Sequence, residues 1–243
     1  MSLPALEVLR RVPLFAELAE ADLEALAALA RERRYPKGSV IVFSGELGDA
    51  LYVIARGRVK VVLLDEDGRE VILALLGAGS FFGELALLDE EPRSAHVIAV
   101  EHSMMLVLRR ADFRARLRQA PELSLALLRE LSRRLRRADE RIGAFVLLDV
   151  PGRVAHLLLR LAADAGGGDR IPRRLTHDLM GQLAGTSRES FSRALRRLAQ
   201  RDIIEVTREH IVLRDRHALE LAARQAPVPR PQGQRDGATP SAG

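Results

Sequence analysis

Hydrophobic positions change their spacing along the chain, and each change predicts a different kind of element. Between residues 5 and 34 leucines recur at helical intervals, broken once by Pro13, which predicts helical structure. After Pro36-Lys37-Gly38 the apolar residues form short runs separated by glycine-containing turns, and Asp65-Glu66-Asp67-Gly68 predicts a hairpin turn. Several short strands at regular spacing predict a compact β-roll or β-barrel. The predicted strands are 39–43, 50–54, 58–62, 70–73, 96–100 and 104–108.

A long helix is predicted from Pro121 to about residue 148. Its apolar positions are separated alternately by three and four residues over nearly three heptads, and charged residues fill the flanking positions. A seam this regular favours a dimer interface over a face buried within its own domain. The seam comprises Leu128, Leu131, Leu135, Ala138, Ile142 and Phe145.

The segment Asp149-Val150-Pro151-Gly152 interrupts this helix and predicts a domain boundary. Beyond it the pattern predicts an amphipathic helix, a glycine loop, two short helices, a small β-wing and a last helix, and then a disordered tail rich in proline and glycine. These elements are 153–163, 166–168, 178–184, 187–200, 203–206 with 210–213, 217–224 and 226–243. The predicted domains are therefore 1–120, 121–148 and 149–225, followed by the tail 226–243.

Composition narrows the class of protein. The 243 residues are 47% hydrophobic and 29% charged, which is typical of a soluble globular protein. Cysteine is absent, which excludes disulfides, cysteine-ligated zinc, iron–sulfur clusters and thiol nucleophiles. No apolar run approaches the ~20 residues of a membrane span, and the N-terminal segment with Glu7, Arg10 and Arg11 is unlike a secretory signal. We therefore expect a cytoplasmic protein without membrane contact.

The net charge of +5 is carried by the C-terminal part of the chain. Residues 1–148 contain 22 basic and 22 acidic side chains, whereas residues 149–243 contain 16 basic and 11 acidic ones. A basic module beside a neutral one suggests a polyanionic partner for the basic module. An arginine-rich surface without a partner is the alternative on charge alone.

One candidate binding site is Phe82-Gly83-Glu84-Leu85-Ala86, followed by Arg93-Ser94-Ala95. Gly83 allows backbone amides to approach an anion, and the turn after it can present further N–H groups. Arg93 can bind a phosphate through two parallel hydrogen bonds, and Ser94 adds a hydroxyl donor. Glu84 disfavours a phosphate but can accept a hydrogen bond from a sugar hydroxyl. Together these groups predict a nucleotide pocket; an ordinary loop with an Arg–Glu surface pair is the alternative.

A second candidate site lies in residues 176–193, where two short helices meet at Gly185. Arg188, Glu189 and Arg193 fall on the first turns of the second helix and can point outward together. Arginine can read guanine O6 and N7, and a carboxylate can accept from cytosine N4, so the pattern favours a recognition helix. The alternative is that Glu189 only caps the helix and the arginines are only solvated. The predicted core of the two helices is Leu183, Phe191, Leu195 and Leu198.

The order and separation of the two motifs, Gly83-Glu84-Leu85-Ala86…Arg93-Ser94-Ala95 and Thr186-Ser187-Arg188-Glu189…Arg193, carry a family resemblance. Over about residues 10–222 the chain resembles the cyclic AMP receptor protein (Crp/Fnr) family of bacterial transcription regulators. The resemblance implies an α+β protein with an N-terminal cyclic-nucleotide-binding β-roll, a long dimerisation helix and a C-terminal winged helix-turn-helix.

The resemblance also implies roles for individual residues. Glu84 would accept from the ribose 2′-hydroxyl, Arg93 and Ser94 would hold the cyclic phosphate with Gly83, and Arg134 would reach from the long helix towards the pocket. The implied ligand-binding residues are Gly83, Glu84, Leu85, Arg93, Ser94, Ala95, Arg134, Ala138 and Asp139. The implied DNA-binding residues are Thr176 and Ser187, which would touch phosphates, and Arg188, Glu189 and Arg193, which would read bases.

Ala138 and Asp139 depart from the family pattern, in which members that respond to cyclic AMP place a Thr-Ser pair to meet the adenine. Asp139 could accept from the adenine amino group, but guanine offers it two adjacent donors. The haem and iron–sulfur branches are disfavoured, because cysteines are absent and none of the six histidines has an evident partner ligand. Glu84 and Arg93 both suit a cyclic mononucleotide, so a cyclic dinucleotide is also disfavoured.

The sequence therefore predicts a homodimeric regulator that is not an enzyme, binds cyclic AMP without a metal, and reads a two-fold symmetric DNA operator. RNA polymerase is a further expected partner. Ligand binding would shift the population of dimer-helix arrangements, and a hinge near Asp149 would set the recognition helices ~34 Å apart. Cyclic GMP as the ligand, or an altered pocket that leaves DNA binding ligand-independent, are the alternatives.

Overall fold

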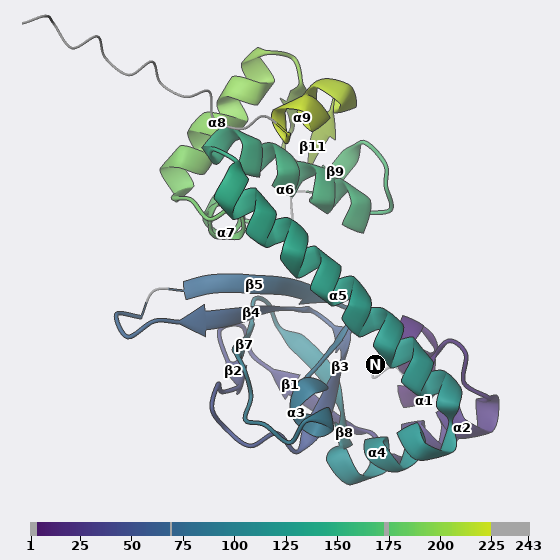
Figure 1. Cartoon of the computed structure of the whole chain (residues 1–243). Coiled ribbons are helices and arrows are strands. Elements are labelled where there is room, and N and C mark those ends of the chain that lie inside the picture. The colour runs from purple at the N-terminus through teal and green to yellow at the C-terminus, as the bar shows by residue number, and fades with distance from the viewer. Residues whose placement is uncertain (1–3, 69, 173–174, 225–243) are drawn as a thin grey trace, which may run out of the picture. The chain divides into compact units, whose positions relative to one another are not determined.

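The computed structural model describes residues 4–68, 70–172 and 175–224 (Figure 1). Two compact units can be distinguished within them. The first runs to Ile142 and also takes in Asp178–Arg188, and the second comprises Gly143–His177 and the chain from Glu189 onward.

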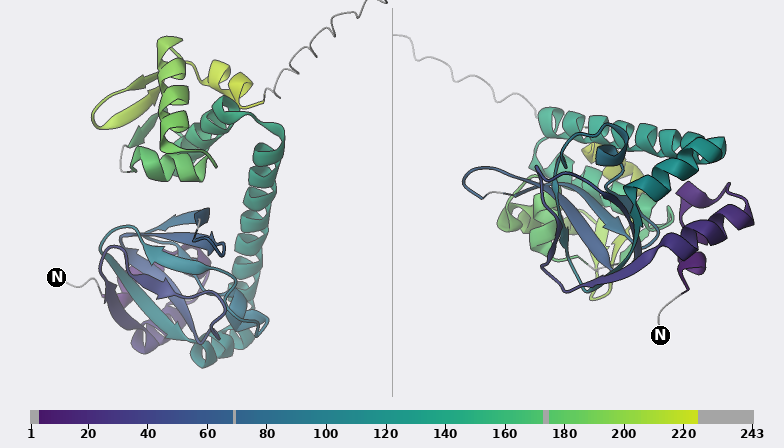
Figure 2. Two further views of the ribbon diagram at one scale, coloured as in Figure 1. Left: turned by 90° about the vertical axis from the view of Figure 1, so that its left-hand side faces the viewer. Right: turned by 90° about the horizontal axis from the view of Figure 1, so that it is seen from below.

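Two four-stranded antiparallel sheets form the centre of the first unit. One has the strand order β1-β8-β3-β6 and the other β2-β7-β4-β5. Figures 1 and 2 show the two sheets facing each other. The strands are β1 (Arg31–Tyr35), β2 (Val40–Val42), β3 (Ala50–Arg56), β4 (Arg58–Leu64), β5 (Glu70–Gly77), β6 (Phe81–Phe82), β7 (His96–Ala99) and β8 (Ser103–Arg109).

The facing sides of the sheets bury alternate residues, as a strand period of two requires. Val59 on β4 packs in one cluster with Ile54 on β3 and Met105 on β8, and all three are fully buried. The rings of Tyr52 and Phe82 stack with centroids 4.9 Å apart. The cluster includes Phe82, the first residue of the first candidate site, so it packs against the buried side of that segment.

Every predicted strand overlaps an observed one, and the predicted hairpin turn is confirmed. Gly68 donates to the carbonyl oxygen of Asp65 over 3.0 Å between β4 and β5. Gly68 has φ +76°, a left-handed conformation that glycine adopts without steric cost.

The prediction of helical structure from 5 to 34 is only partly right. The structure has α1 (Ala5–Arg10), a 3-10 turn (Pro13–Phe15) and α2 (Glu20–Leu29), but Arg31–Tyr35 forms β1. This strand pairs antiparallel with β8, some seventy residues further along the chain. Its first four residues are exposed, so neither a burial pattern nor a β-branched run marked it as a strand. The turn expected after Gly83 forms α3 (Leu85–Leu88), whereas α4 (Arg110–Gln119) and β6 were not predicted.

The N-terminal helices share a second core with α4 and the beginning of α5 (Pro121–Leu147). Phe15 and Phe113 are fully buried in this core, and Leu123 and Leu127 are the contribution of α5. The other side of α5 remains uncovered in the single chain: Leu128, Leu135 and Ile142 are 60%, 64% and 61% exposed. Leu131 is an exception within the predicted seam, because it packs partly against the N-terminal core.

The second unit begins its own helices at α6 (Val150–Asp164), three residues earlier than predicted. Asp149 caps this helix by accepting from Gly152 N over 2.9 Å, and Pro151 occupies its first turn. An Asp cap followed by proline starts a helix, so the segment that ends α5 also initiates α6.

The remaining elements match the predicted winged arrangement, with one added strand. Strands β10 and β11 pair as expected, and β9 joins the other edge of β11. The elements are β9 (Arg170–Pro172), α7 (His177–Leu183), α8 (Arg188–Gln200), β10 (Ile204–Val206), β11 (His210–Leu213) and α9 (Arg216–Ala222). The predicted tail 226–243 lies outside the described residues. None of the described helices is long and apolar enough to cross a membrane.

Candidate ligand pocket and candidate nucleic-acid interface

Arg93 is a buried cation held by backbone oxygens. It is 7% exposed; its Nη1 donates to Gly83 O over 2.6 Å and its Nη2 donates to Ala50 O over 2.7 Å. Burial lowers the pKa of the Arg93 guanidinium, whereas the nearby Tyr52 and acidic groups raise it. In the described part of the chain no carboxylate forms an ion pair with Arg93. A buried cation without an ion-pair partner favours the binding of an anion.

Two glycines make room for this guanidinium. A Cβ at Gly83, whose φ is +89°, would lie 2.4 Å from Arg93 Nη1, and a Cβ at Gly48 would lie 2.7 Å from Arg93 Cζ. Gly83 was predicted as a site residue, but Gly48 was missed. The signal for Gly48 in the sequence was its place as a second glycine in Gly45-Glu46-Leu47-Gly48, but its proximity to Arg93 depends on tertiary contacts.

The loop that precedes β3 holds the backbone of Arg93 in place. Arg93 N donates to Glu46 O and Gly45 N donates to Arg93 O, each over 2.8 Å. On the opposite side the guanidinium lies 5.9 Å from the centroid of the Tyr52 ring. Burial raises the pKa of the Tyr52 hydroxyl, so this ring stays neutral beside the cation.

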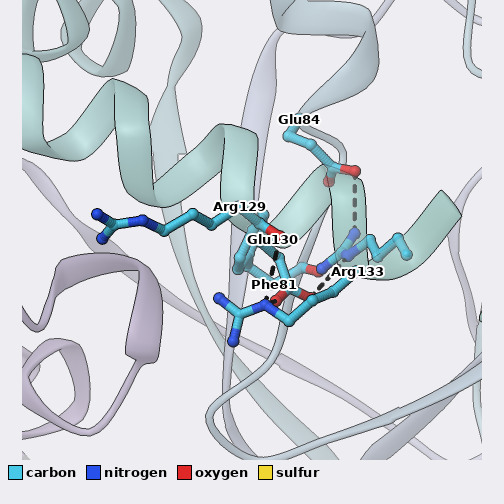
Figure 3. Close-up of polar contacts among 6 residues, drawn as sticks. Phe81, Glu84, Arg129, Glu130 and Arg133 are labelled. Atoms are coloured by element: carbon cyan, nitrogen blue, oxygen red, sulfur yellow. Dashed lines mark hydrogen bonds and ion pairs between the residues drawn. The ribbon is translucent and has the colours of Figure 1, made fainter. Parts of the chain in front are cut away.

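Glu84 is the buried acceptor of the site. It is 4% exposed, and its Oε1 accepts from Arg134 Nη1 over 2.9 Å (Figure 3). Its Oε2 is buried and has no hydrogen-bond partner within residues 4–68, 70–172 and 175–224. A buried carboxylate oxygen without a donor costs free energy, so it provides an unoccupied acceptor for a bound hydroxyl.

Arg134 connects α5 to the motif segment through several contacts. Its Nη2 donates to Phe81 O over 2.7 Å, its Nε donates to Glu130 Oε1 over 3.1 Å, and its Cζ lies 4.4 Å from the Phe81 ring centroid. Figure 3 shows Arg129 pointing away from this group, and it pairs with Glu17 over 2.6 Å. The structure therefore brings Arg134, and not its neighbour on the preceding turn, to Glu84.

The other predicted ligand residues differ in burial. Ala95 is buried, Leu85 is 46% exposed, and Ser94 is exposed. Ala138 and Asp139 lie exposed on α5, and Asp139 forms no ion pair with any residue in the described ranges. The structure therefore joins Glu84 with Arg134 and Gly83 with Arg93, but it places no polar partner against Asp139.

The second candidate site is an exposed face of α8. Arg188, Glu189 and Arg193 are exposed, while Phe191, Leu195 and Leu198 on the other face are buried, as predicted. Thr176 and Ser187 are also exposed, each immediately before the first residue of a helix.

The turn between α7 and α8 is closely packed. Thr186 N donates to Gly181 O over 2.9 Å, and a Cβ at Gly181 would lie 3.0 Å from Thr186 O. His177, at the start of α7, contacts α8: its ring packs edge-on against Phe191 with centroids 5.6 Å apart, and its Nδ1 lies 3.1 Å from Ser192 Oγ. His177 and Gly181 are structural residues that the sequence analysis did not single out.

Two family models match the two sites. The cyclic nucleotide-binding domain matches residues 32–120, which include Glu84 and Arg93, and the Crp-like helix-turn-helix domain matches residues 152–222. The described residues contain no cluster of three or more side chains suited to hold a metal ion. The fold and the sites therefore define a transcription regulator of the class that joins a cyclic-nucleotide-binding domain to a helix-turn-helix.

Curated relatives agree with this class. The chain is 38% identical to the cyclic AMP receptor protein of Thermus thermophilus, over 87% of this chain and 96% of the relative. It is 34% identical to a CRP-like cAMP-activated global transcriptional regulator of Mycobacterium tuberculosis, over 90% of this chain and 99% of the relative. The chain belongs to the Crp/Fnr family, and the predicted resemblance is confirmed.

A solved structure supports the fold independently of close sequence similarity. A CooA variant from Carboxydothermus hydrogenoformans is 24% identical, has a TM-score of 0.73, and covers 92% of this chain and 97% of its own. At this identity the likeness shows the fold alone, and it confirms the predicted architecture of β-roll, long helix and helix-turn-helix.

Proposed function

We propose that the protein is a sequence-specific DNA-binding transcription regulator controlled by a cyclic mononucleotide, with cyclic AMP as the ligand. The observation that carries this proposal concerns two buried groups: among the described residues, Arg93 has no ion-pair partner and Glu84 Oε2 has no hydrogen-bond donor. One phosphate and one ribose hydroxyl would satisfy both. The relatives named as cAMP-activated regulators support the same ligand class.

The chemistry of the pocket favours a phosphodiester beside a sugar. The phosphate would bring its negative charge to Arg93. Ser94, which is exposed, follows Arg93 in the chain, and Gly83 O accepts from Arg93 Nη1 over 2.6 Å. Glu84 would repel a phosphate but accept from a neutral hydroxyl. Leu85 and Ala95 complete the proposed ligand-binding set with Arg134, Ala138 and Asp139.

The proposed assembly is a homodimer on DNA. The uncovered leucine and isoleucine side chains of α5 support α5 as the dimer interface. Exposed Arg188, Glu189 and Arg193 would read bases, and Thr176 and Ser187 would contact phosphates. The proposed domains are 1–120 for the ligand, 121–148 for dimerisation and 149–225 for DNA, with RNA polymerase as a further partner.

Titration calorimetry with cyclic AMP and cyclic GMP side by side tests the ligand. We expect cyclic AMP to bind at micromolar or lower concentration and to change affinity for an operator DNA. Adenosine, which lacks the phosphate, is the matched control and should bind far more weakly because it offers Arg93 no charge. If neither cyclic AMP nor cyclic GMP binds, control by a cyclic mononucleotide is refuted and a ligand-independent regulator remains.

Cyclic GMP is a second candidate because Asp139 is exposed and has no ion-pair partner in the described part of the chain. If it meets the base, guanine supplies two donors and adenine one. The double change Ala138→Thr with Asp139→Ser should then raise cyclic AMP affinity and lower cyclic GMP affinity. Unchanged affinities for both nucleotides would mean that this pair does not read the base.

A further inference from the structure

Two arginines connect the same two backbone segments around the pocket. Arg93 donates to Ala50 O and to Gly83 O. Arg110, the first residue of α4, donates its backbone N–H to Asp49 O over 2.7 Å and its Nη2 to Ala86 O over 3.0 Å. The segments 49–50 and 83–86 are therefore joined twice, once through each arginine.

The second segment needs such support. Glu84 lies directly before α3, which is only four residues long and has no side-chain cap at its start. A single helical turn of this kind is not stable by itself, because nucleation fixes several residues for one hydrogen bond. The bond from Arg110 to Ala86 O provides α3 with a tertiary contact from α4.

Glu90, two residues beyond the end of α3, contacts the same helix. Glu90 has φ +66°, a left-handed conformation that costs free energy for a residue other than glycine. Arg114 Nη1 donates to Glu90 Oε1 over 2.5 Å, and Arg110 Nη2 lies 3.7 Å from the same oxygen. The hydrogen bond from Arg114 is the first cause that lowers the pKa of Glu90, and the charge of Arg110 is the second.

A bound ligand would affect the hydrogen bonds of the two arginines differently. Arg93 uses two of its five N–H donors on Gly83 O and Ala50 O, and a bound anion would compete with these two carbonyl oxygens for its guanidinium. Arg110 is tied to the backbone at Asp49 and to Ala86 O, and it can keep the two segments together when Arg93 does not.

We propose that Arg110 is a positioning residue of the ligand pocket: it fixes the spacing of segments 49–50 and 83–86, and thereby the placement of Glu84 and α3, when Arg93 is engaged by the anion. This inference rests on the proposed function, since it assigns a role in the same site. Neither sequence motif includes Arg110, which lies at the junction of β8 and α4.

The first test needs no ligand. Hydrogen exchange of the backbone amides is measured in the full-length protein and in Arg110→Leu, Arg110→Lys and Arg114→Leu. We expect Arg110→Leu to speed exchange at residues 84–88, and Arg110→Lys to restore most of the protection because lysine keeps one donor. Arg114→Leu removes a neighbouring partner of Glu90 but leaves the Ala86 bond, so it should resemble wild type at 84–88.

The second test uses cyclic AMP as the probe. Arg110→Leu should weaken binding about tenfold, the scale on which one hydrogen bond to a charged group contributes, with Arg110→Lys close to wild type. In the background Arg93→Lys the further change Arg110→Leu should have a larger effect than in wild type, because the Arg93 connection between the two segments is then already weakened. A residue with only a general effect on stability would give additive losses.

The outcomes separate this inference from the proposed function. Faster exchange at 84–88 in Arg110→Leu, together with coupled losses of affinity, supports the positioning role. If wild type binds neither cyclic nucleotide, the proposed function fails, while the exchange result still decides whether Arg110 orders the segment. Unchanged exchange in Arg110→Leu, or no recovery of exchange and affinity in Arg110→Lys, would overturn the inference.

Discussion

Arg134 and Glu84 form an ion pair of 2.9 Å between the long helix α5 and the buried start of α3. Only one carboxylate oxygen takes part, because Glu84 Oε2 is buried without a partner. The pair leaves one side of Glu84 available for a ligand while the other side remains attached to α5. Occupancy of the pocket can therefore alter a contact of the helix whose outer face is proposed to form the dimer.

Arg93 and Glu84 should contribute differently to cyclic AMP affinity. Arg93→Leu removes the positive charge and would leave the phosphate desolvated without a partner, so we expect a loss of about 2–5 kcal/mol. Glu84→Gln keeps the shape and one acceptor, so its loss should be smaller. Calorimetry on both variants provides the comparison, and an affinity of Arg93→Leu equal to wild type would show that the pocket lies elsewhere.

Gly83→Ala should damage the pocket although it adds only a methyl group. Its φ of +89° disfavours a side chain by about 1–2 kcal/mol, and the new Cβ would lie 2.4 Å from Arg93 Nη1. We expect a lower melting temperature and weaker cyclic AMP binding. Gly77→Ala is the matched control, because a Cβ there meets no atom within 4 Å. Equal behaviour of the two variants would contradict the role of Gly83.

The exposed side of α5 should hold a dimer in the absence of ligand and DNA. Leu135 is 64% exposed in the single chain, and Leu135→Asp would bury a carboxylate in the interface at a cost of several kcal/mol, about 3 or more. Light scattering should give a dimer for wild type and a monomer for the variant at micromolar concentration.

Leu221→Asp is the control for this experiment, because Leu221 is 48% exposed on α9 and lies outside the predicted seam. It should remain dimeric. A monomeric wild type would refute α5 as a dimer interface.

On DNA, the exposed residues of α8 should act at particular base pairs. Arg188→Ala and Arg193→Ala should each cost about 1–3 kcal/mol at one operator position, and Glu189→Ala should relax selection at a cytosine. Selection from random DNA measures this, and the family resemblance implies a palindrome of the TGTGA…TCACA type. Arg118→Ala, a change on exposed α4 surface, should select the same site as wild type. Recovery of sites without two-fold symmetry would argue against the proposed mode of binding.

Glu90 should make the ligand-binding unit more stable above its ordinary pKa than below it. Its pKa is lowered, first by the hydrogen bond from Arg114 and then by the charge of Arg110. A carboxyl whose pKa is lower in the folded state stabilises that state when ionised, and this contribution is lost as the pH falls through the folded pKa.

Thermal unfolding of wild type and Glu90→Gln checks this expectation. Wild type should melt higher at about pH 7, and the difference should narrow as the pH falls below about 4 and vanish below the lowered pKa of Glu90. Glu101→Gln is the control for loss of an exposed carboxylate. A gap between wild type and Glu90→Gln that is independent of pH would exclude the charge as its cause.

Local patterns were sufficient to predict most elements and both motifs. The strand runs, the hairpin turn at Asp65–Gly68 and the heptad spacing of α5 each depend on residues close in sequence, whose periodicity reports which side is buried. The exposure of Leu135 in the single chain and the buried face of α8 agree with those patterns. The interruption of the helix before Asp149 is observed, since α5 ends at Leu147, but the cap and proline that begin α6 there were read as an interruption only.

The tertiary structure decided the contacts between segments that lie far apart in the chain. Arg93 reaches Ala50 across 43 positions and Arg134 reaches Glu84 across 50, and β1 exists because it pairs with β8. The roles of Gly48 and Arg110 follow from the same long-range packing. The sequence by itself determined which residues could bind a phosphate and a hydroxyl. Only the fold decided that, among the described residues, Arg93 lacks an ion-pair partner and Glu84 Oε2 lacks a donor, because burial and hydrogen-bond partners depend on chain segments that no local spacing brings together.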